Sequence, residues 1–280
     1  MADNTSLVEI IHAHLASDRL HLPVFPPLAM QLQDILAQDN CNIQQVAAKI
    51  MEDQALASHL LRVANSAFFT GLSKVSTIRD AIVRLGGKQV TSLVMLVTQQ
   101  QQYRSSHKVF RAYIESLWKH AVSCAMGTKW LAEKSGYRPL APEAFLAGLL
   151  HDIGKLFLLK VLEDIHTSGQ YHMNLSKAIV GEVMESMHAE HGARLLQQWN
   201  LPELYCDVAR DHHKEDYDPN NTVLTMVRLV NLTCHKLGIG MQHDPSLVLA
   251  ATAEAQALET SEFLLAELEI MLEDAMALAR

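Results

Sequence analysis

Residues 144–155 read AFLAGLLHDIGK, an apolar stretch that ends in a histidine and an aspartate, with a lysine three residues later. Its alanines and leucines are strong helix formers, so the stretch predicts a buried helix running through His151 to about Leu162. Charged groups in so apolar a helix are costly unless they find partners. The helical repeat allows His151, Asp152 and Lys155 to share one face.

These three side chains suggest either metal chemistry or a structural network. A neutral imidazole beside a carboxylate is a good ligand pair for a borderline divalent metal. The ammonium group of Lys155 could hold a phosphate oxygen or protonate a leaving group. The alternative is a buried network of His151, Asp152 and Lys155 that fixes helix packing without a metal.

The composition predicts an all-α protein around this stretch. Hydrophobic residues make up 49% of the 280 residues but aromatic residues only 6%, a mixture that favours helices packed on helices. Helical periodicity dominates, and we find no alternating strand pattern and no glycine-rich phosphate loop. Thr77 is expected to cap a helix over 78–85 that stops at Gly86. Two short helices are expected over 176–187 and 189–199.

Charge and targeting signals limit the partners and the location. A net charge of −8 argues against nucleic-acid binding, which needs clustered lysine and arginine. The N-terminus lacks the features of a signal peptide, and no apolar run is long enough for a membrane span, so we expect a cytoplasmic protein without membrane contact. The four cysteines form no CxxC pair, and buried free thiols are expected.

The other histidines are ambiguous when each is taken alone. His120 lies inside an apolar helix, where a histidine is usually part of the core. His188 and His191 stand one turn apart, so they could bind a metal together, or one could face inward and the other water. His212 and His213 lie near a helix C-terminus, where the helix dipole favours a positive charge.

Taken in order, these motifs resemble the HD superfamily of metal-dependent phosphohydrolases and, more closely, its HDOD relatives from bacterial signalling proteins. The resemblance covers roughly 20–231. Its N-terminal blocks are LPVFPP at 22–27, DQAL at 53–56, LRVANSAFF at 61–69 and IRDAIVRLG at 78–86. Its C-terminal blocks are 145–155 and 188–202. The resemblance implies an N-terminal helical half over 1–105, an HD-type helical core over 106–240 and a C-terminal helical extension over 241–280.

The resemblance also implies a ligand set. Asp152 would bridge two ions if two bind, and Lys155 would sit by a substrate phosphate. Asn231 stands where HD enzymes have their last acidic ligand; its neutral amide oxygen would weaken one metal position. The implied metal ligands are His120, His151, Asp152, His188, His212 and His213. Catalytic roles would belong to Asp152 and Lys155, and the metal would be one or two divalent ions of iron, manganese, nickel or zinc.

Two functions follow from the resemblance, and a third reading stays open. The first is a regulatory module that acts through a signalling protein partner or a small nucleotide ligand, with little or no catalysis. The second is a metal-dependent phosphohydrolase acting on a nucleotide or a cyclic dinucleotide, in which metal-activated water attacks phosphorus. Residues 214–219 lack the Gly-Tyr-Pro motif of the cyclic-di-GMP phosphodiesterase relatives. In the third reading, the histidines form a metal-free polar core.

Overall fold

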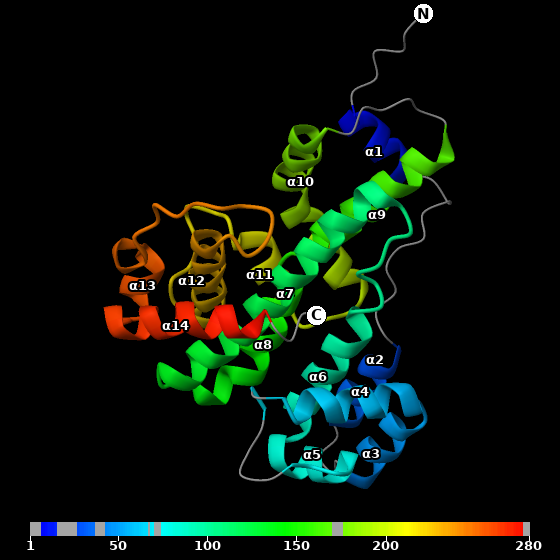
Figure 1. Cartoon of the computed structure of the whole chain (residues 1–280), viewed down its shortest axis with the longest axis vertical. Coiled ribbons are helices and arrows are strands. Elements are labelled where there is room, and N and C mark those ends of the chain that lie inside the picture. Colours follow the sequence, from blue (N-terminus) through cyan, green and yellow to red (C-terminus); the bar gives the residue numbers. More distant parts are fainter. Residues whose placement is uncertain are drawn as a thin grey trace, which may run out of the picture.

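The computed structural model describes residues 7–15, 27–36, 43–66, 68–69, 74–169 and 176–276, and every regular element within these ranges is helical. The all-α prediction is therefore confirmed (Figure 1). Residues 22–26 of the first N-terminal block, and Cys41, lie outside the described residues. The α-helices are α1 (Leu7–Leu15), α2 (Pro27–Leu36), α3 (Ile43–Met51), α4 (Gln54–Ala64), α5 (Ile78–Leu85), α6 (Gly87–Gln99), α7 (Lys108–Lys134), α8 (Ala141–Leu150), α9 (Ile153–Ser168), α10 (Lys177–Gln198), α11 (Glu203–Asp211), α12 (Thr222–Leu237), α13 (Ala253–Ala257) and α14 (Glu262–Ala275).

Helices α2 to α6 gather at one end of the molecule, shown in blue and cyan in Figure 1. The hydroxyl of Thr77 accepts a hydrogen bond from the Asp80 amide at 3.1 Å, which caps α5 as expected. Gly86 ends α5 with a φ of 82°, a conformation that favours glycine. Helix α1 does not join this group, because it packs against α9.

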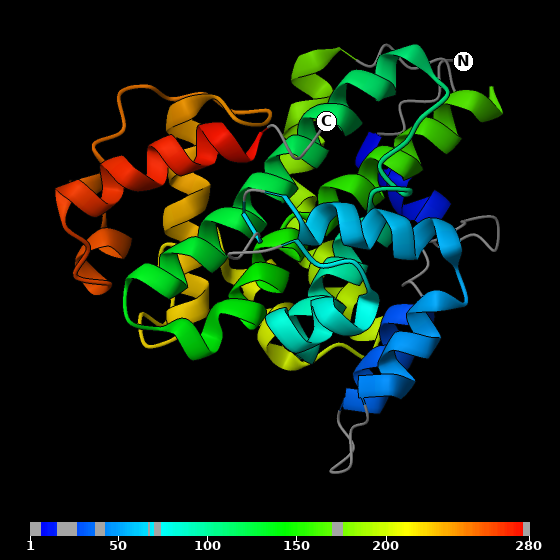
Figure 2. The same ribbon diagram turned by 60° about the horizontal axis from the view of Figure 1, so that its bottom comes forward.

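The 27-residue helix α7 forms the centre of the remaining helices, with α8 packed along it (Figures 1 and 2). A Cβ atom at Gly148 would lie 2.6 Å from the carbonyl oxygen of Cys124. Glycine at this position therefore lets the backbone of α8 approach that of α7. Helix α14 covers the far side of α7, where Leu268 and Leu272 are buried within the same chain.

The two groups of helices meet where α6 packs on α8. Lys88 forms an ion pair with Glu143 at 2.8 Å, and the rings of Phe69 and Phe145 meet edge to face with centroids 6.2 Å apart. Because α8 leads directly into His151, the N-terminal helices support the helix that carries the histidine–aspartate pair.

The structure corrects two predicted helix boundaries. The helix expected to continue through His151 divides there into α8 and α9, because Asp152 adopts φ −102° and ψ 15°, outside helical values. Conversely, 177–198 form one continuous helix, α10, where two were expected. The expected break lay at His188, but neither His188 nor Ala189 opposes a helical backbone, so the helix continues through them.

Two further expectations can be compared with the described part of the chain. Cys124, Cys206 and Cys234 are free and buried, as expected for structural thiols. None of the described helices combines the length and apolar character needed to cross a membrane.

Candidate metal centre

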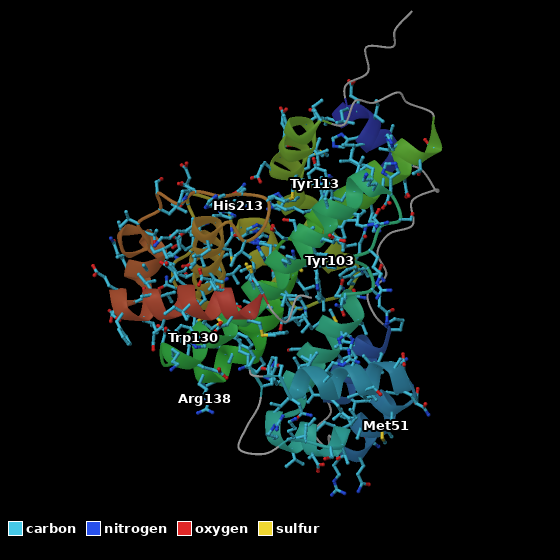
Figure 3. The ribbon with its side chains drawn as sticks, viewed as in Figure 1. Met51, Tyr103, Tyr113, Trp130, Arg138 and His213 are labelled. Carbon is cyan, nitrogen blue, oxygen red and sulfur yellow. The ribbon has the colours of Figure 1, made fainter. Side chains whose placement is uncertain are left out.

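Five histidines from four parts of the fold converge on the carboxylate of Asp152. Helix α7 supplies His120, α10 supplies His188, and the end of α11 supplies His212 and His213; His151 and Asp152 occupy the junction between α8 and α9. Asp152 is 1% exposed, and only His213 of the five histidines is exposed (Figure 3). The structure thus brings together every metal ligand proposed from the sequence except Asn231, whose amide is considered below.

The two carboxylate oxygens of Asp152 divide the cluster into two halves. In the half around Oδ1, which we call the Oδ1 half, the Nε2 atoms of His188 and His212 lie 3.4 and 3.3 Å away. A nitrogen of His213 also lies within 4.8 Å of this group.

The Oδ2 half contains the remaining side chains. The Nε2 atoms of His120 and His151 lie 3.4 and 3.5 Å from Asp152 Oδ2. Lys155, in the first turn of α9, donates a hydrogen bond to the same oxygen at 2.9 Å. An ammonium group therefore already neutralises this side of the carboxylate.

Backbone carbonyls orient four of these imidazoles in the same way. The Nδ1 atoms of His120, His151 and His188 lie 2.9, 2.8 and 2.6 Å from the carbonyl oxygens of residues 239, 148 and 184. His212 Nδ1 lies 2.9 Å from the carbonyl of residue 209. A carbonyl can only accept, so Nδ1 carries the proton, and a neutral ring turns the lone pair of Nε2 toward Asp152.

This arrangement fits a bound cation. His188 Nε2 and His212 Nε2 are 3.2 Å apart, and those of His120 and His151 are 3.3 Å apart. Two lone pairs that face each other at this distance repel unless a positive charge lies between them. Asp152 Oδ1 is buried and accepts no hydrogen bond from any described residue. Imidazole nitrogens around a carboxylate are suitable ligands for a divalent transition metal.

Burial and neighbouring charges set the protonation states of several groups in the centre. Burial raises the pKa of Asp152, but the charge of Lys155, the largest of several opposing interactions, helps to hold this pKa well below its usual range. Burial lowers the pKa of His151 well below its ordinary value and lowers that of His188 to about 4. At neutral pH, the centre thus presents an ionised carboxylate with neutral imidazoles at His151 and His188, whereas burial of His120 is outweighed by Cys124 and Asp152, which raise its pKa to about 9.

Close backbone contacts place His188 and His120 in the centre. A Cβ atom at Gly154 would lie 1.9 Å from the carbonyl oxygen of His188, so glycine allows α10 to reach Asp152. Gly238, with φ 68°, ends α12 and directs the carbonyl of Ile239 to His120 Nδ1.

Arg228 holds the turn that presents the double histidine. Its guanidinium donates to the carbonyl oxygens of His212 and Lys214 at 3.0 and 2.8 Å and stacks on Tyr217 at 3.9 Å. Glu254, which precedes α14, accepts a hydrogen bond from Arg228 Nε at 2.8 Å. The C-terminal extension therefore supports the Oδ1 half through Arg228.

Sequence reasoning missed several of these residues, because their roles depend on contacts between distant segments. Arg228, Ile239 and His235 belong to this group; the ring of His235 stacks on that of His120 with centroids 6.0 Å apart. His191 lies outside the cluster, beside His12 and Phe157. Among the missed residues, only Ile239 carried a local sequence signal, because the glycines on either side of it indicate a turn.

Asn231 is buried on α12, one turn before Cys234 and His235, which both contact residues of α7. Its amide oxygen accepts no hydrogen bond from the described part of the chain. Helical spacing places this residue on the face of α12 that packs against α7.

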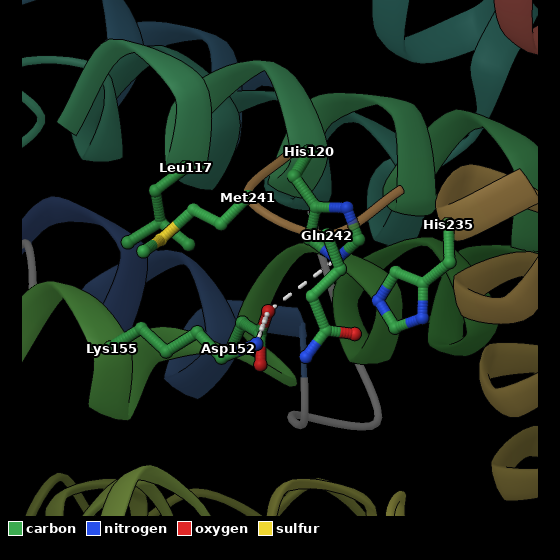
Figure 4. A pocket seen from close by; sticks show the side chains of 7 residues that line it. All are labelled: Leu117, His120, Asp152, Lys155, His235, Met241 and Gln242. Atoms are coloured by element: carbon green, nitrogen blue, oxygen red, sulfur yellow. Dashed lines mark hydrogen bonds and ion pairs between the residues drawn. The ribbon is translucent and has the colours of Figure 1, made fainter. Parts of the chain in front are cut away.

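A small pocket opens on the Oδ2 half (Figure 4). Its space is about 230 Å³ including the open mouth, and its lining comprises Leu117, His120, Asp152, Lys155, His235, Met241 and Gln242. Gln242 donates a hydrogen bond to Glu185 at 2.6 Å and so links the segment after α12 to α10. Typical small-molecule sites have volumes of about 300–1,000 Å³, so this pocket is small for a nucleotide.

Comparisons with known proteins identify the family and the fold. The pattern of the HDOD domain matches residues 22–215. A curated but uncharacterised protein of Treponema pallidum is 26% identical over 227 residues, which are 78% of this chain and 43% of that protein. The chain thus corresponds to less than half of that relative's length.

Solved structures with the same fold share little sequence. An HDOD domain protein of unknown function from Geobacter sulfurreducens has a TM-score of 0.75 at 22% identity, covering 96% of both chains. A protein from Shewanella amazonensis, provisionally named a metal-dependent phosphohydrolase, has a TM-score of 0.70 at 19% identity, covering 96% of this chain and 97% of that one. A protein from Marinobacter aquaeolei, provisionally named a signal transduction protein, has a TM-score of 0.69 at 22% identity, covering 99% of this chain and 66% of that one.

Proposed function

Because the chain belongs to the HDOD family, we propose that it is a signal-transduction protein whose metal centre has a structural or regulatory role, with little or no catalytic turnover. The observation that carries this proposal is the composition of the Oδ2 half. Lys155 already neutralises Asp152 Oδ2, and the resemblance to HD enzymes aligns the neutral amide of Asn231 with their last acidic ligand. The Oδ2 half is therefore a weak position for an ion.

The Oδ1 half is the stronger position and would hold one divalent ion of iron, manganese, nickel or zinc. Its ligands would be Asp152, His188, His212 and His213, which together offer one negative charge and three imidazoles. Such an ion, when bound, lowers the pKa of its water and polarises phosphoryl oxygens. Hydrolysis by an HD-type centre would also need a charge-stabilising partner on the Oδ2 side, where this chain lacks the acidic ligand.

The partner of this regulatory module would be a signalling protein, or a small nucleotide ligand that binds without being hydrolysed. Two features support this view. Helices α2 to α6 add a separate surface that a bare hydrolase does not need, and the pocket over the Oδ2 half is small. Similar folds include the protein provisionally named a signal transduction protein.

A turnover assay tests this proposal. Tag-free protein loaded with Mn²⁺ or Fe²⁺ should bind about one ion per chain and hydrolyse neither nucleoside triphosphates nor cyclic dinucleotides above the rate of metal-free controls. Hydrolysis at an enzyme-like rate, on the order of 1 s⁻¹, would contradict it if Asp152→Ala abolished the activity.

The second candidate function is a metal-dependent phosphohydrolase acting on a nucleotide or a cyclic dinucleotide. The complete set of histidines and the buried Lys155 at the pocket favour it. In this case, Lys155 would leave Asp152 and stabilise negative charge on the phosphate. Lys155→Met should then lower kcat while leaving metal stoichiometry unchanged, whereas the regulatory proposal predicts no turnover to lose.

A further inference from the structure

Two buried cysteines lie beside the metal centre, and the function proposed above does not use them. Cys124 follows His120 by one turn on α7, and Cys234 lies on α12, which packs against α7. Cys124 Sγ is 3.7 Å from Cys234 Sγ and 3.6 Å from His120 Nε2. All three ligand atoms lie within 4.8 Å of one another, and all three residues are buried.

Two of these separations match those of ligands around one tetrahedral ion, and the third lies within 4.8 Å. At bond lengths of about 2.3 Å to sulfur and about 2.0 Å to nitrogen, a zinc ion holds two sulfurs about 3.8 Å apart, and a sulfur and a nitrogen about 3.5 Å apart. The separations of 3.7 and 3.6 Å differ from these values by about 0.1 Å. The three groups can therefore reach one ion with little movement of α7 or α12.

The charges of the cluster also suit a divalent ion. When the ion binds, each thiol releases its proton to solvent, and two thiolates with a neutral imidazole cancel a charge of +2. A neutral site avoids most of the cost of burying an unpaired charge. Thiolate ligands select zinc or copper(I) over manganese and magnesium, which prefer oxygen ligands.

The orphaned amide of Asn231 adds an independent observation. This side chain is 3% exposed, and its Oδ1 atom has no hydrogen-bond partner among the described residues. Asn231 precedes Cys234 by three residues, so both lie on one face of α12. Its oxygen, on the same face of α12 as Cys234, is a candidate for the fourth ligand.

We propose that His120, Cys124 and Cys234 form a separate thiolate site for zinc, distinct from the Oδ1 half. His120 Nε2 has one lone pair, and it lies 3.4 Å from Asp152 Oδ2 and 3.6 Å from Cys124 Sγ. It can therefore bind an ion in the thiolate site or in the Oδ2 half, but not in both. Zinc in the thiolate site ties α7 to α12 and removes His120 from the Oδ2 half.

Cobalt(II) is a suitable probe, since thiolate ligands give cobalt a sulfur-to-metal charge-transfer band in the near ultraviolet. Reduced, tag-free protein titrated with Co²⁺ should develop this band with about one sulfur-bound cobalt per chain. Cys124→Ser and Cys234→Ser should each reduce the band by at least half. Cys206→Ser, which alters a buried thiol on α11, and Cys41→Ser should leave it unchanged.

Asp152→Asn separates this inference from the proposed function. This variant should lose binding of Mn²⁺ in the Oδ1 half but keep the sulfur–cobalt band, because its three ligands remain. A band absent from the wild-type protein, or one of unchanged intensity in Cys124→Ser, overturns the thiolate site without affecting the Oδ1 half.

X-ray absorption supplies a readout that does not depend on the folding of the cysteine variants. Asp152→Asn protein with one equivalent of zinc should show two sulfur neighbours at about 2.3 Å from the ion. A first shell of nitrogen and oxygen alone overturns the proposal, as does a zinc-free protein in which the two cysteines have joined in a disulfide.

Discussion

The two halves of the centre share Asp152 but differ in what surrounds each oxygen. The Oδ1 half has three imidazoles and no competing cation, and Arg228 fixes the turn that carries two of them. The Oδ2 half has two imidazoles and the ammonium of Lys155. A nearly complete list of histidines therefore does not imply two equivalent ions, because ligand charge and competing cations decide occupancy.

The largest effect is expected from Gly154→Ala, which would displace the helix that carries His188, a ligand of the Oδ1 half. The new methyl group would lie 1.9 Å from the backbone of His188, so α10 must move away from Asp152. Thermal or denaturant unfolding should show a loss of about 1–3 kcal/mol, as for other overpacked sites. The control is Gly181→Ala on α10, where a Cβ atom would meet open space, and this change should be neutral or stabilising.

Removing one imidazole from each half compares the two directly. His188→Ala should weaken Mn²⁺ binding by about 100-fold, because it removes a ligand of the occupied half. His120→Ala should change Mn²⁺ affinity by less than about threefold, since its half would be empty of manganese. Isothermal titration calorimetry measures both, and equal losses would mean that the halves are used alike.

Asn231→Asp should make the halves more alike. A carboxylate on α12 adds a negative ligand to the Oδ2 half, and the affinity for a second Mn²⁺ should rise by about tenfold or more. Metal analysis after equilibrium dialysis would show this as a second bound ion. The control is Asn220→Asp, which adds the same charge at an exposed position and should leave one bound ion per chain. If Asn231→Asp also bound only one Mn²⁺ per chain, the amide of Asn231 would not be what limits the second position.

Arg228→Lys should weaken the Oδ1 half less than His188→Ala does. Lysine cannot reproduce the fork of hydrogen bonds to the carbonyls of His212 and Lys214, so the double histidine loses its fixed orientation. Mn²⁺ affinity should fall by about tenfold, in the range seen for residues that orient metal ligands. The control is Arg194→Lys, at an exposed ion pair on α10. If both changes lowered Mn²⁺ affinity equally, Arg228 would have no specific role in orienting the double histidine.

Local sequence patterns predicted the helices better than the contacts between them. Periodicity and caps located α5 and α12 closely, but the division of α8 from α9 at Asp152 could not be read from the continuous helical pattern of 144–162. His120, His188 and His212 were ambiguous one by one; only the order of motifs in a known family joined them to Asp152. Cys124 and Cys234 were correctly predicted as buried free thiols, but their proximity could not be predicted, because it exists only after α12 packs on α7.

Anomalous diffraction from crystals soaked in Mn²⁺ would test the asymmetry of the centre most directly. We predict one strong manganese peak beside Asp152 Oδ1, His188 and His212, with little or no peak on the side of His120 and His151. Two peaks of equal height, or a single peak between Asp152 Oδ2 and His120, would contradict it.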